Sequence, residues 1–199
     1  MASSFQQARV TWDHLLSFLR QRFRLENRRT WRLWDSAQIA RLLHVPTGAS
    51  IRTIASDPAR MHGLAPSLVI ADEPAQWERT KSDPAIAALR TGLGKIDRSR
   101  LVAIGTRPDH PGHWFERMLR DERSLVFAAG KDDDPFEEAT WHKANPSLRF
   151  FPSLLKRTRQ EAALARRDPS ALASFRALRL NQGVPDTCLL YTSPSPRDS

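Results

Sequence analysis

The sixteen residues GLAPSLVIADEPAQWE, Gly63–Glu78, decide the fold. Within them an apolar run, Leu68–Ala71, ends in two adjacent acids, Asp72 and Glu73. The β-branched, non-alternating character of this run is typical of a strand buried on both faces, as in a parallel sheet. Open α/β sheets bind ligands at the carboxyl ends of such strands. We therefore expect the two acids to lie at a ligand site.

Two further apolar runs of the same kind follow along the chain, Leu101–Gly105 and Ser124–Ala128. Between the three runs lie two predicted helices, Asp83–Leu93 and Gly112–Arg120, and we expect Asp83 to cap the first, with the next proline in its first turn. The order strand, helix, strand, helix, strand predicts a three-layer α/β fold with a mostly parallel central sheet.

Helices are also predicted at both ends of this region. Apolar residues recur every three or four positions near the start of the chain, which indicates an amphipathic helix; they are Phe5, Ala8, Trp12, Leu15, Leu16, Leu19 and Phe23. Two short extended segments, Ile39–Leu43 and Ser50–Ala55, then flank a Pro/Gly turn. Towards the end, Pro152–Arg167 and Pro169–Asn181 each open with proline and are rich in Ala, Leu and Arg, so both are predicted helices.

The composition excludes several classes of protein. With 199 residues the chain suffices for one domain with a proper core, and 40% hydrophobic and 27% charged residues fit a soluble globular protein. Its apolar runs are too short to span a membrane. A single cysteine, Cys188, permits neither an internal disulfide nor a thiolate zinc cluster.

The net charge of +9 is unevenly distributed. Residues 1–60 and 141–199 each carry ten basic and four acidic side chains, whereas 61–140 carries eleven basic and fourteen acidic ones. Two basic flanks suggest a polyanionic partner such as nucleic acid, although solvated helix faces would account for them equally well.

The paired acids have a specific chemistry in nucleotide hydrolysis. Asp72 could hold a phosphate-bound Mg²⁺, directly or through water, and Glu73 could polarise the water that attacks a γ-phosphate. Four apolar residues followed by Asp-Glu form a Walker B pattern, although such acids also occur at strand ends where they simply face solvent. Thr106, after the second run, could sense the γ-phosphate; the alternative is a plain Gly-Thr turn. A phosphate-binding loop is missing, since no Gly-Lys pair is followed by Ser or Thr, and Gly94-Lys95 is followed by Ile.

Other candidate sites have simpler explanations. The acidic segment Gly130–Glu138 could bind a metal, but we favour a solvated loop. His110 and His113 lack a third ligand nearby and are interpreted as loop histidines. Six tryptophans could stack on bases. Of these, Trp12 and Trp114 are expected in the core, and Trp77 is expected to anchor the loop after the Walker B acids.

Several segments, in order, resemble one protein family. They are SSFQQAR at 3–9, IRTIASDPARMHGLAPSLVIADEPAQW at 51–77, LVAIGTRP at 101–108, WHKANPSL at 141–148 and FRALRLNQ at 175–182. This combination resembles the ATPase domain of tailed-phage terminase large subunits, the DNA-packaging motors, over roughly residues 3–186. The resemblance implies a P-loop NTPase of the additional-strand class.

The resemblance also implies how the chain is organised. Residues 1–187 are expected to be a partial terminase ATPase domain with a helical end at 152–181. The Walker A region is expected upstream of Met1 and the RNase H-like nuclease beyond the last helix, so that this fragment alone should not hydrolyse ATP. Residues 188–199, CLLYTSPSPRDS, resemble translated sequencing-adapter read-through and are expected to be non-native.

The roles of the site residues follow from the same resemblance. It implies Asp72 as the Mg²⁺-site acid, Glu73 as the catalytic carboxylate and Thr106 as the residue that couples ATP hydrolysis to motion, with ATP and Mg²⁺ as cofactors. A trans-acting arginine is expected in such ring motors, and Arg60 is the first candidate. Because His62 stands where many relatives place arginine, Arg52 and Arg79 also stay open.

The resemblance further implies the partners and the cellular role. These are double-stranded DNA, a portal protein, a terminase small subunit and other copies of the chain in a homo-oligomeric ring. The place of action is the host cytoplasm, transiently at the procapsid, with no secretion and no membrane. Two alternatives stay open: a non-enzymatic DNA-binding module that uses the basic flanks, and a helicase-like ATPase. The ANPSL and LNQ segments argue against the helicase.

Overall fold

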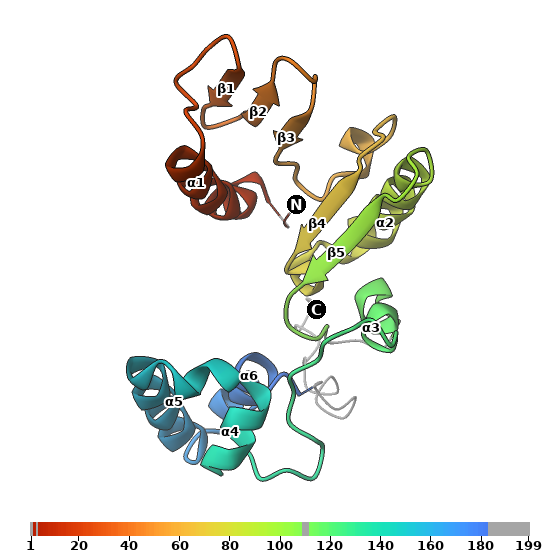
Figure 1. The fold of residues 1–199 in the computed structure, drawn as a ribbon. Coiled ribbons are helices and arrows are strands. Elements are labelled where there is room, and N and C mark those ends of the chain that lie inside the picture. The colour runs from red at the N-terminus through yellow and green to blue at the C-terminus, as the bar shows by residue number, and fades with distance from the viewer. Residues whose placement is uncertain (1, 3, 109–111, 183–199) are drawn as a thin grey trace, which may run out of the picture. The chain divides into compact units, whose positions relative to one another are not determined.

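The computed structural model describes residues 2, 4–108 and 112–182 (Figure 1). They divide into two compact units, Met1–Gly105 and Thr106–Ser199. The first contains helices and two small sheets, whereas the described part of the second contains helices and loops. The chain is thus a mixed α/β protein, as predicted, but in the described residues the parallel sheet has two strands and a separate sheet is antiparallel, in place of the mostly parallel central sheet that the predicted order indicated.

The first unit opens with helix α1, Phe5–Arg22, at the position that the apolar periodicity predicted. Ser4 caps it by accepting a 3.1 Å hydrogen bond from the backbone N–H of Gln7. Residues spaced four apart, Ala8, Trp12 and Leu16, are buried, which places them on one face of the helix. The prediction of Trp12 as a core residue is confirmed.

An antiparallel sheet of three strands packs against α1 (Figure 1). Its strands are β1 (Trp31–Asp35), β2 (Ala40–His44) and β3 (Ser50–Arg52), in that order. Ala40 and Leu42 of β2 join Trp12 and Leu16 of α1 in one apolar cluster. The two extended segments predicted around the Pro/Gly turn are confirmed as β2 and β3. β1 was not predicted, because Trp34 on its outer face disguises the alternation of buried and exposed positions.

A second, parallel sheet consists of β4 (Leu68–Asp72) and β5 (Arg100–Ile104), joined through helix α2 (Arg79–Leu93). The strands pair in register from Leu68 with Arg100 to Asp72 with Ile104. The predicted parallel pair is confirmed, but the prediction that both faces are buried is wrong. Val69 and Ala71 are buried, whereas Leu68 is 53% and Ile104 57% exposed. Apolar residues occupy both faces of these strands, so the sequence could not show that one face is open.

Helix α2 begins earlier than the sequence indicated. Its N-cap is Glu78, and the backbone N–H groups of Lys81 and Ser82 both donate 2.9 Å hydrogen bonds to the Glu78 carbonyl. Pro84 therefore lies inside the helix, and the prediction that Asp83 caps it is wrong. The hydrogen bonds of the first turn form before the chain reaches Pro84. Because proline has no backbone N–H, the helix loses only one later hydrogen bond.

The predicted third strand, Ser124–Ala128, is also wrong. These residues form no strand, and Leu125 is 80% exposed. Their neighbouring backbone groups bond instead to the end of the last helix: Ala129 N–H donates to the Leu180 carbonyl, and the Phe127 carbonyl accepts from Asn181. A strand needs backbone hydrogen bonds to a neighbouring strand along its length. Here the bonds to Leu180 and Asn181 take the place of such pairing.

The second unit contains the remaining helices. They are α3 (Trp114–Leu119), α4 (Glu138–Ala144), α5 (Pro152–Ala165) and α6 (Pro169–Arg179), with a 3₁₀ turn at Pro146–Arg149. Of these, α3, α5 and α6 were predicted from the sequence and α4 was not. Trp141, Leu148, Phe175 and Leu180 lie in a common apolar core. Trp114 is fully buried, as predicted. Residues 188–199, with Cys188, lie outside the described residues. Across the described helices, none is both long and apolar enough to cross a membrane.

Candidate functional site

Asp72 is the last residue of β4, where it pairs with Ile104 at the end of β5. The carboxylate therefore lies at the carboxyl edge of a parallel sheet, as the sequence predicted. Its Oδ2 accepts a 2.7 Å hydrogen bond from the Thr11 hydroxyl of α1. Because only one carboxylate oxygen takes part in this bond, the group keeps acceptor capacity for a cation or a water.

Glu73 follows Asp72 in a left-handed backbone conformation, with φ 44° and ψ 57°. Its N–H donates a 2.8 Å hydrogen bond to the Ile104 carbonyl, which extends the sheet by one residue before the chain turns. A residue with a β-carbon pays about 1 kcal/mol or more in this region, and such strain concentrates at functional sites. The turn thus directs the Glu73 side chain by backbone geometry rather than by strand alternation.

Gly105 approaches Glu73 closely from the end of β5. A β-carbon at position 105 would lie 2.9 Å from both Cα and Oε2 of Glu73 and 3.1 Å from Cδ of Pro74. Only glycine leaves room for this contact. Sequence reasoning did not assign Gly105 a role; the signal that could have revealed it is a glycine directly after a strand that neighbours the acidic pair.

Trp77 holds the loop that follows the two acids. Its side chain is 3% exposed, and its indole Nε1 donates a 3.1 Å hydrogen bond to the Asp72 carbonyl. The expected anchoring role is confirmed. A buried indole that bonds the backbone of Asp72 stabilises the strand end that carries the carboxylate.

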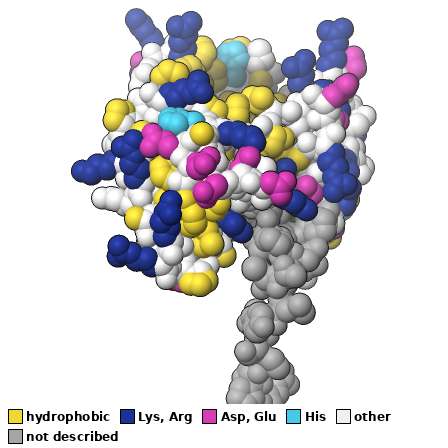
Figure 2. All heavy atoms as spheres, turned by 90° about the horizontal axis from the view of Figure 1, so that it is seen from below, with side chains coloured by type: hydrophobic (Ala, Val, Ile, Leu, Met, Phe, Trp, Pro, Cys, Tyr) yellow, Lys and Arg dark blue, Asp and Glu magenta, His cyan; other side chains and the backbone are white. Residues whose placement is uncertain are grey.

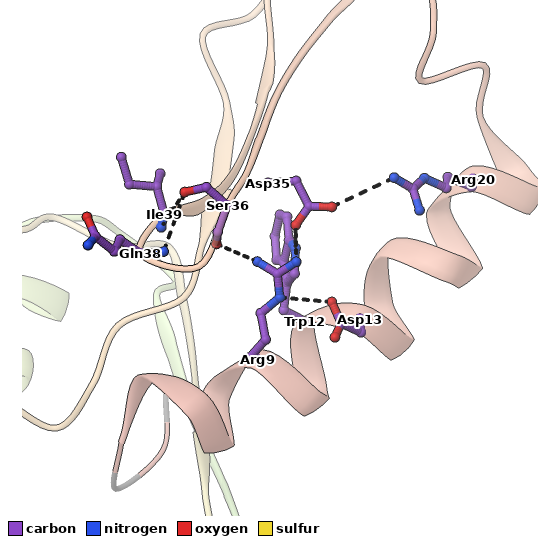
Figure 3. A network of polar contacts seen from close by, with 8 residues as sticks. All are labelled: Arg9, Trp12, Asp13, Arg20, Asp35, Ser36, Gln38 and Ile39. Atoms are coloured by element: carbon purple, nitrogen blue, oxygen red, sulfur yellow. Dashed lines mark hydrogen bonds and ion pairs between the residues drawn. The ribbon is translucent and has the colours of Figure 1, made fainter.

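Thr11 was missed by the sequence analysis, since 61 residues separate it from Asp72. Its helix is fixed by a polar network around Asp35 at the end of β1 (Figure 3). Arg9 contacts the Asp35 carboxylate at 2.5 Å and donates a 2.7 Å hydrogen bond to the Ser36 carbonyl, while the Trp12 indole donates to Asp35 at 3.2 Å. This network holds α1 against the antiparallel sheet, and with it the hydroxyl that meets Asp72.

Thr106, the predicted coupling residue, follows Gly105 directly and begins the second unit, where it is half-buried. The residue after it is fixed by the LNQ segment: the side-chain oxygen of Asn181 accepts a 2.7 Å hydrogen bond from Arg107 N–H. The amide of Gln182 donates to the Gly130 carbonyl at 2.6 Å. The side chains of the LNQ segment therefore tie the segment after β5 to the loop that precedes α4, a role that only the structure reveals.

The arginines proposed for a trans-acting role lie in different places. Arg60 ends a 3₁₀ turn, Pro58–Arg60, and its guanidinium is 68% exposed at 3.5 Å from Asp57. Arg52 is exposed at the end of β3, and His62 is exposed in the turn before β4. The side chain of Arg79 lies outside the described part of the structure. Among these, Arg60 and Arg52 present accessible guanidinium groups.

Two residues from the alternative metal sites, Asp133 and His113, have structural roles. Asp133 in the acidic segment accepts hydrogen bonds at 2.6 Å from Lys143 Nζ and from Gly130 N–H, which lower the pKa of its carboxyl group. His113 is buried and caps α3, where its ring Nδ1 accepts from the backbone N–H of Phe115. His110 lies outside the described residues. Within the described ranges, no group of three or more His, Cys, Asp or Glu side chains gathers as metal ligands.

Fold and site together define a mixed α/β protein that carries two adjacent carboxylates at the carboxyl edge of a parallel strand pair. The chain is similar to the HK97 bacteriophage large terminase. It matches the crystal structure of that protein with a TM-score of 0.74 and 25% sequence identity. This similarity, over 92% of the chain, confirms the resemblance to terminase large subunits. The chain spans 38% of the length of that terminase. No protein-family model and no curated protein sequence matches it.

Proposed function

We propose that this chain is part of the ATPase motor of a phage terminase large subunit, which couples ATP hydrolysis to translocation of double-stranded DNA into a capsid. The observation that carries the proposal is the Asp72–Glu73 pair at the carboxyl edge of β4, in a chain similar to a large terminase over most of its length. Residues 1–187 would form part of a P-loop ATPase domain of the additional-strand class.

Asp72 would hold Mg²⁺. In phosphoryl transfer this ion neutralises the charge that develops on the transferred phosphate. Mg²⁺ prefers hard oxygen ligands and is bound through one or two carboxylates together with water and nucleotide phosphates. A single Asp72 carboxylate, oriented by the Thr11 hydroxyl, fits this donor set better than it would fit a cage made of protein ligands alone.

Glu73 would orient the attacking water and accept its proton. The left-handed backbone of Glu73 and its close contact with Gly105 fix the point at which the side chain leaves the backbone. Fixing a general base before the reaction removes the need to order it in the transition state. The two adjacent acids would thereby take different tasks, since Asp72 ends the strand and Glu73 lies in the left-handed turn that follows it.

The remaining assignments extend the same proposal. Thr106 would couple hydrolysis to motion, and Arg60 of a neighbouring subunit in a homo-oligomeric ring would act in trans. A portal protein and a terminase small subunit would be the protein partners, in the host cytoplasm and transiently at the procapsid. The exposure of Arg60 supports its role, because a trans-acting guanidinium must reach beyond its own subunit.

The test uses the complete reading frame that contains this chain, assayed for Mg²⁺-dependent ATP hydrolysis. Glu73→Gln and Asp72→Asn are each expected to lower kcat by about a hundredfold or more. Glu78→Gln is the matched control, because Glu78 is exposed and its side chain bonds only its near neighbours Lys81 and Thr80. A reading frame without ATP hydrolysis, or equal rates for all three variants, would overturn the proposal.

A further inference from the structure

The antiparallel sheet has an outer face that is basic. Residues opposite each other across an antiparallel sheet point to the same face, and Trp34, Arg41 and Arg52 are opposite one another on β1, β2 and β3. Arg32 lies two residues before Trp34 and shares their face. We call Arg32, Trp34, Arg41 and Arg52 the basic sheet face. The other face carries Ala40 and Leu42, which pack with α1.

This face has no acidic side chain on its strands. The one acid of the three strands, Asp35, has the opposite orientation and is engaged by Arg9 and Arg20 of α1. Within the described part of the chain, no ion pair involves any of the three arginines of the basic sheet face. Elsewhere, acidic and basic side chains lie close together, as on the surface in Figure 2. The basic sheet face therefore has an excess of positive charge that no ion pair among the described residues balances.

Two of the arginines are placed where they disfavour folding. Arg41 and Arg52 are directly opposite each other on β2 and β3, and both are exposed. Like charges at opposite positions of neighbouring strands destabilise a sheet by a few tenths of a kcal/mol. A bound anion would remove this repulsion.

Trp34 orients one of these arginines. The guanidinium carbon of Arg41 lies 5.3 Å from the centre of the Trp34 ring, and Trp34 remains 38% exposed. A cation–π contact of this kind holds the arginine without neutralising it. Because Arg41 already covers the ring, Trp34 is not an open platform for stacking an unpaired base. The arrangement favours contact with a sugar–phosphate backbone.

The face continues into an open hollow of about 550 Å³ at the free edge of β1. Arg28, Arg32 and Trp34 line it, together with one acid, Glu26. The hollow extends the positive surface beyond the sheet to Arg28, so that a long polyanion could follow it.

From these observations we infer that the basic sheet face binds the phosphate backbone of duplex DNA. Neighbouring strands lie about 4.8 Å apart, so arginines on β1, β2 and β3 span roughly 10 Å. One strand of duplex DNA presents a phosphate about every 3.4 Å along its axis, and arginine forks match phosphate geometry. The choice of DNA among polyanions rests on the proposed function, whereas the location of the contact rests on the sheet alone.

The test measures binding of a fluorescein-labelled duplex of about 30 base pairs to the 199-residue chain by fluorescence anisotropy, between about 50 and 300 mM NaCl. The variant Arg32→Gln/Arg41→Gln/Arg52→Gln removes the positive face. The variant Lys95→Gln/Lys131→Gln/Arg149→Gln removes the same charge from exposed residues that make no ion pair among the described residues. Circular dichroism melting confirms that both variants fold.

We expect the first variant to raise Kd by about tenfold or more and to reduce the slope of log K against log salt by about 0.9 for each phosphate that is no longer neutralised. The control should change Kd by less than about threefold and leave the slope close to that of the parent chain. Glu73→Gln should leave DNA binding unchanged, so ATP hydrolysis and DNA binding report on separate proposals.

Three outcomes would overturn the inference. The first is a parent chain that does not bind the duplex at the lowest salt concentration. The second is a control variant that weakens binding as much as the removal of the positive face does. The third is a positive face that is required for binding phosphatidylserine vesicles or single strands but not for binding the duplex.

Discussion

Thr11 and Asp72 are joined by a 2.7 Å hydrogen bond from the threonine hydroxyl to the carboxylate, across 61 positions of the chain. Thr11 belongs to the helix that the Arg9–Asp35 network fixes, and Asp72 to the end of the parallel sheet. The bond therefore connects the two halves of the first unit at the acidic pair. One carboxylate oxygen is oriented by α1, and the carboxylate keeps further acceptor capacity.

Thr11→Val is expected to raise the Mg²⁺ concentration that ATP hydrolysis requires. The isosteric valine removes the hydroxyl, so the Asp72 carboxylate loses a fixed donor worth about 1.5 kcal/mol for a charged acceptor. In the complete reading frame, the Mg²⁺ concentration for half-maximal ATP hydrolysis should rise by about tenfold, the equivalent of that energy. Thr11→Ser keeps the donor and should restore the parent value. An unchanged Mg²⁺ titration for Thr11→Val would show that the bond does not position Asp72.

Gly105→Ala is expected to destabilise the site. The added β-carbon would meet Cα and Oε2 of Glu73 at 2.9 Å, and the backbone cannot yield as a flexible side chain can. We expect the free energy of unfolding of the 199-residue chain in urea to fall by about 1–3 kcal/mol. Gly94→Ala is the control, since its β-carbon would lie 3.6 Å from the nearest atom and its φ of −63° suits alanine. That change should be neutral or slightly stabilising, and equal losses for both variants would contradict the close approach.

Glu161→Gln is expected to reduce stability at neutral pH more than in acid. Glu161 of α5 accepts hydrogen bonds from Arg179 of α6 and from Arg157, and these lower the pKa of its carboxyl group below the ordinary 4.5. A lowered pKa in the folded state adds stability above pH 4.5, and that stability is lost as the pH falls through the folded-state value. Urea unfolding at about pH 7 should show a loss of about 1 kcal/mol that shrinks towards about pH 3. Glu122→Gln, an exposed control, should change little at either pH, and parallel curves for both variants would refute the linkage.

Local patterns made much of the fold predictable. The spacing of Ala8, Trp12 and Leu16 indicated α1, and the prolines at 152 and 169 marked the starts of α5 and α6. In each case the signal lies within a few turns of one helix. The acids at the end of β4 were predictable for the same reason, since the strand and its last residue are contiguous.

Other predictions failed where the outcome depended on a distant segment. Residues 124–128 have the composition of a strand, but the neighbouring backbone bonds to Leu180 and Asn181. β1 was missed because its exposed face carries a tryptophan, which local patterning associates with burial. Both errors arose because an apolar side chain indicates a preference for burial but does not show whether a neighbouring strand or helix is there to bury it.

The sequence by itself determined α1, α3, α5 and α6, the parallel strand pair and the adjacent acids, because each depends on interactions within short stretches of chain. The tertiary structure alone decided that Thr11 meets Asp72, that Gly105 makes room for Glu73, and that Arg32, Arg41 and Arg52 share one face. These relationships depend on which surfaces come together when the chain closes on itself. The spacing of residues along a sequence carries no information about contacts across dozens of positions, and packing supplies it.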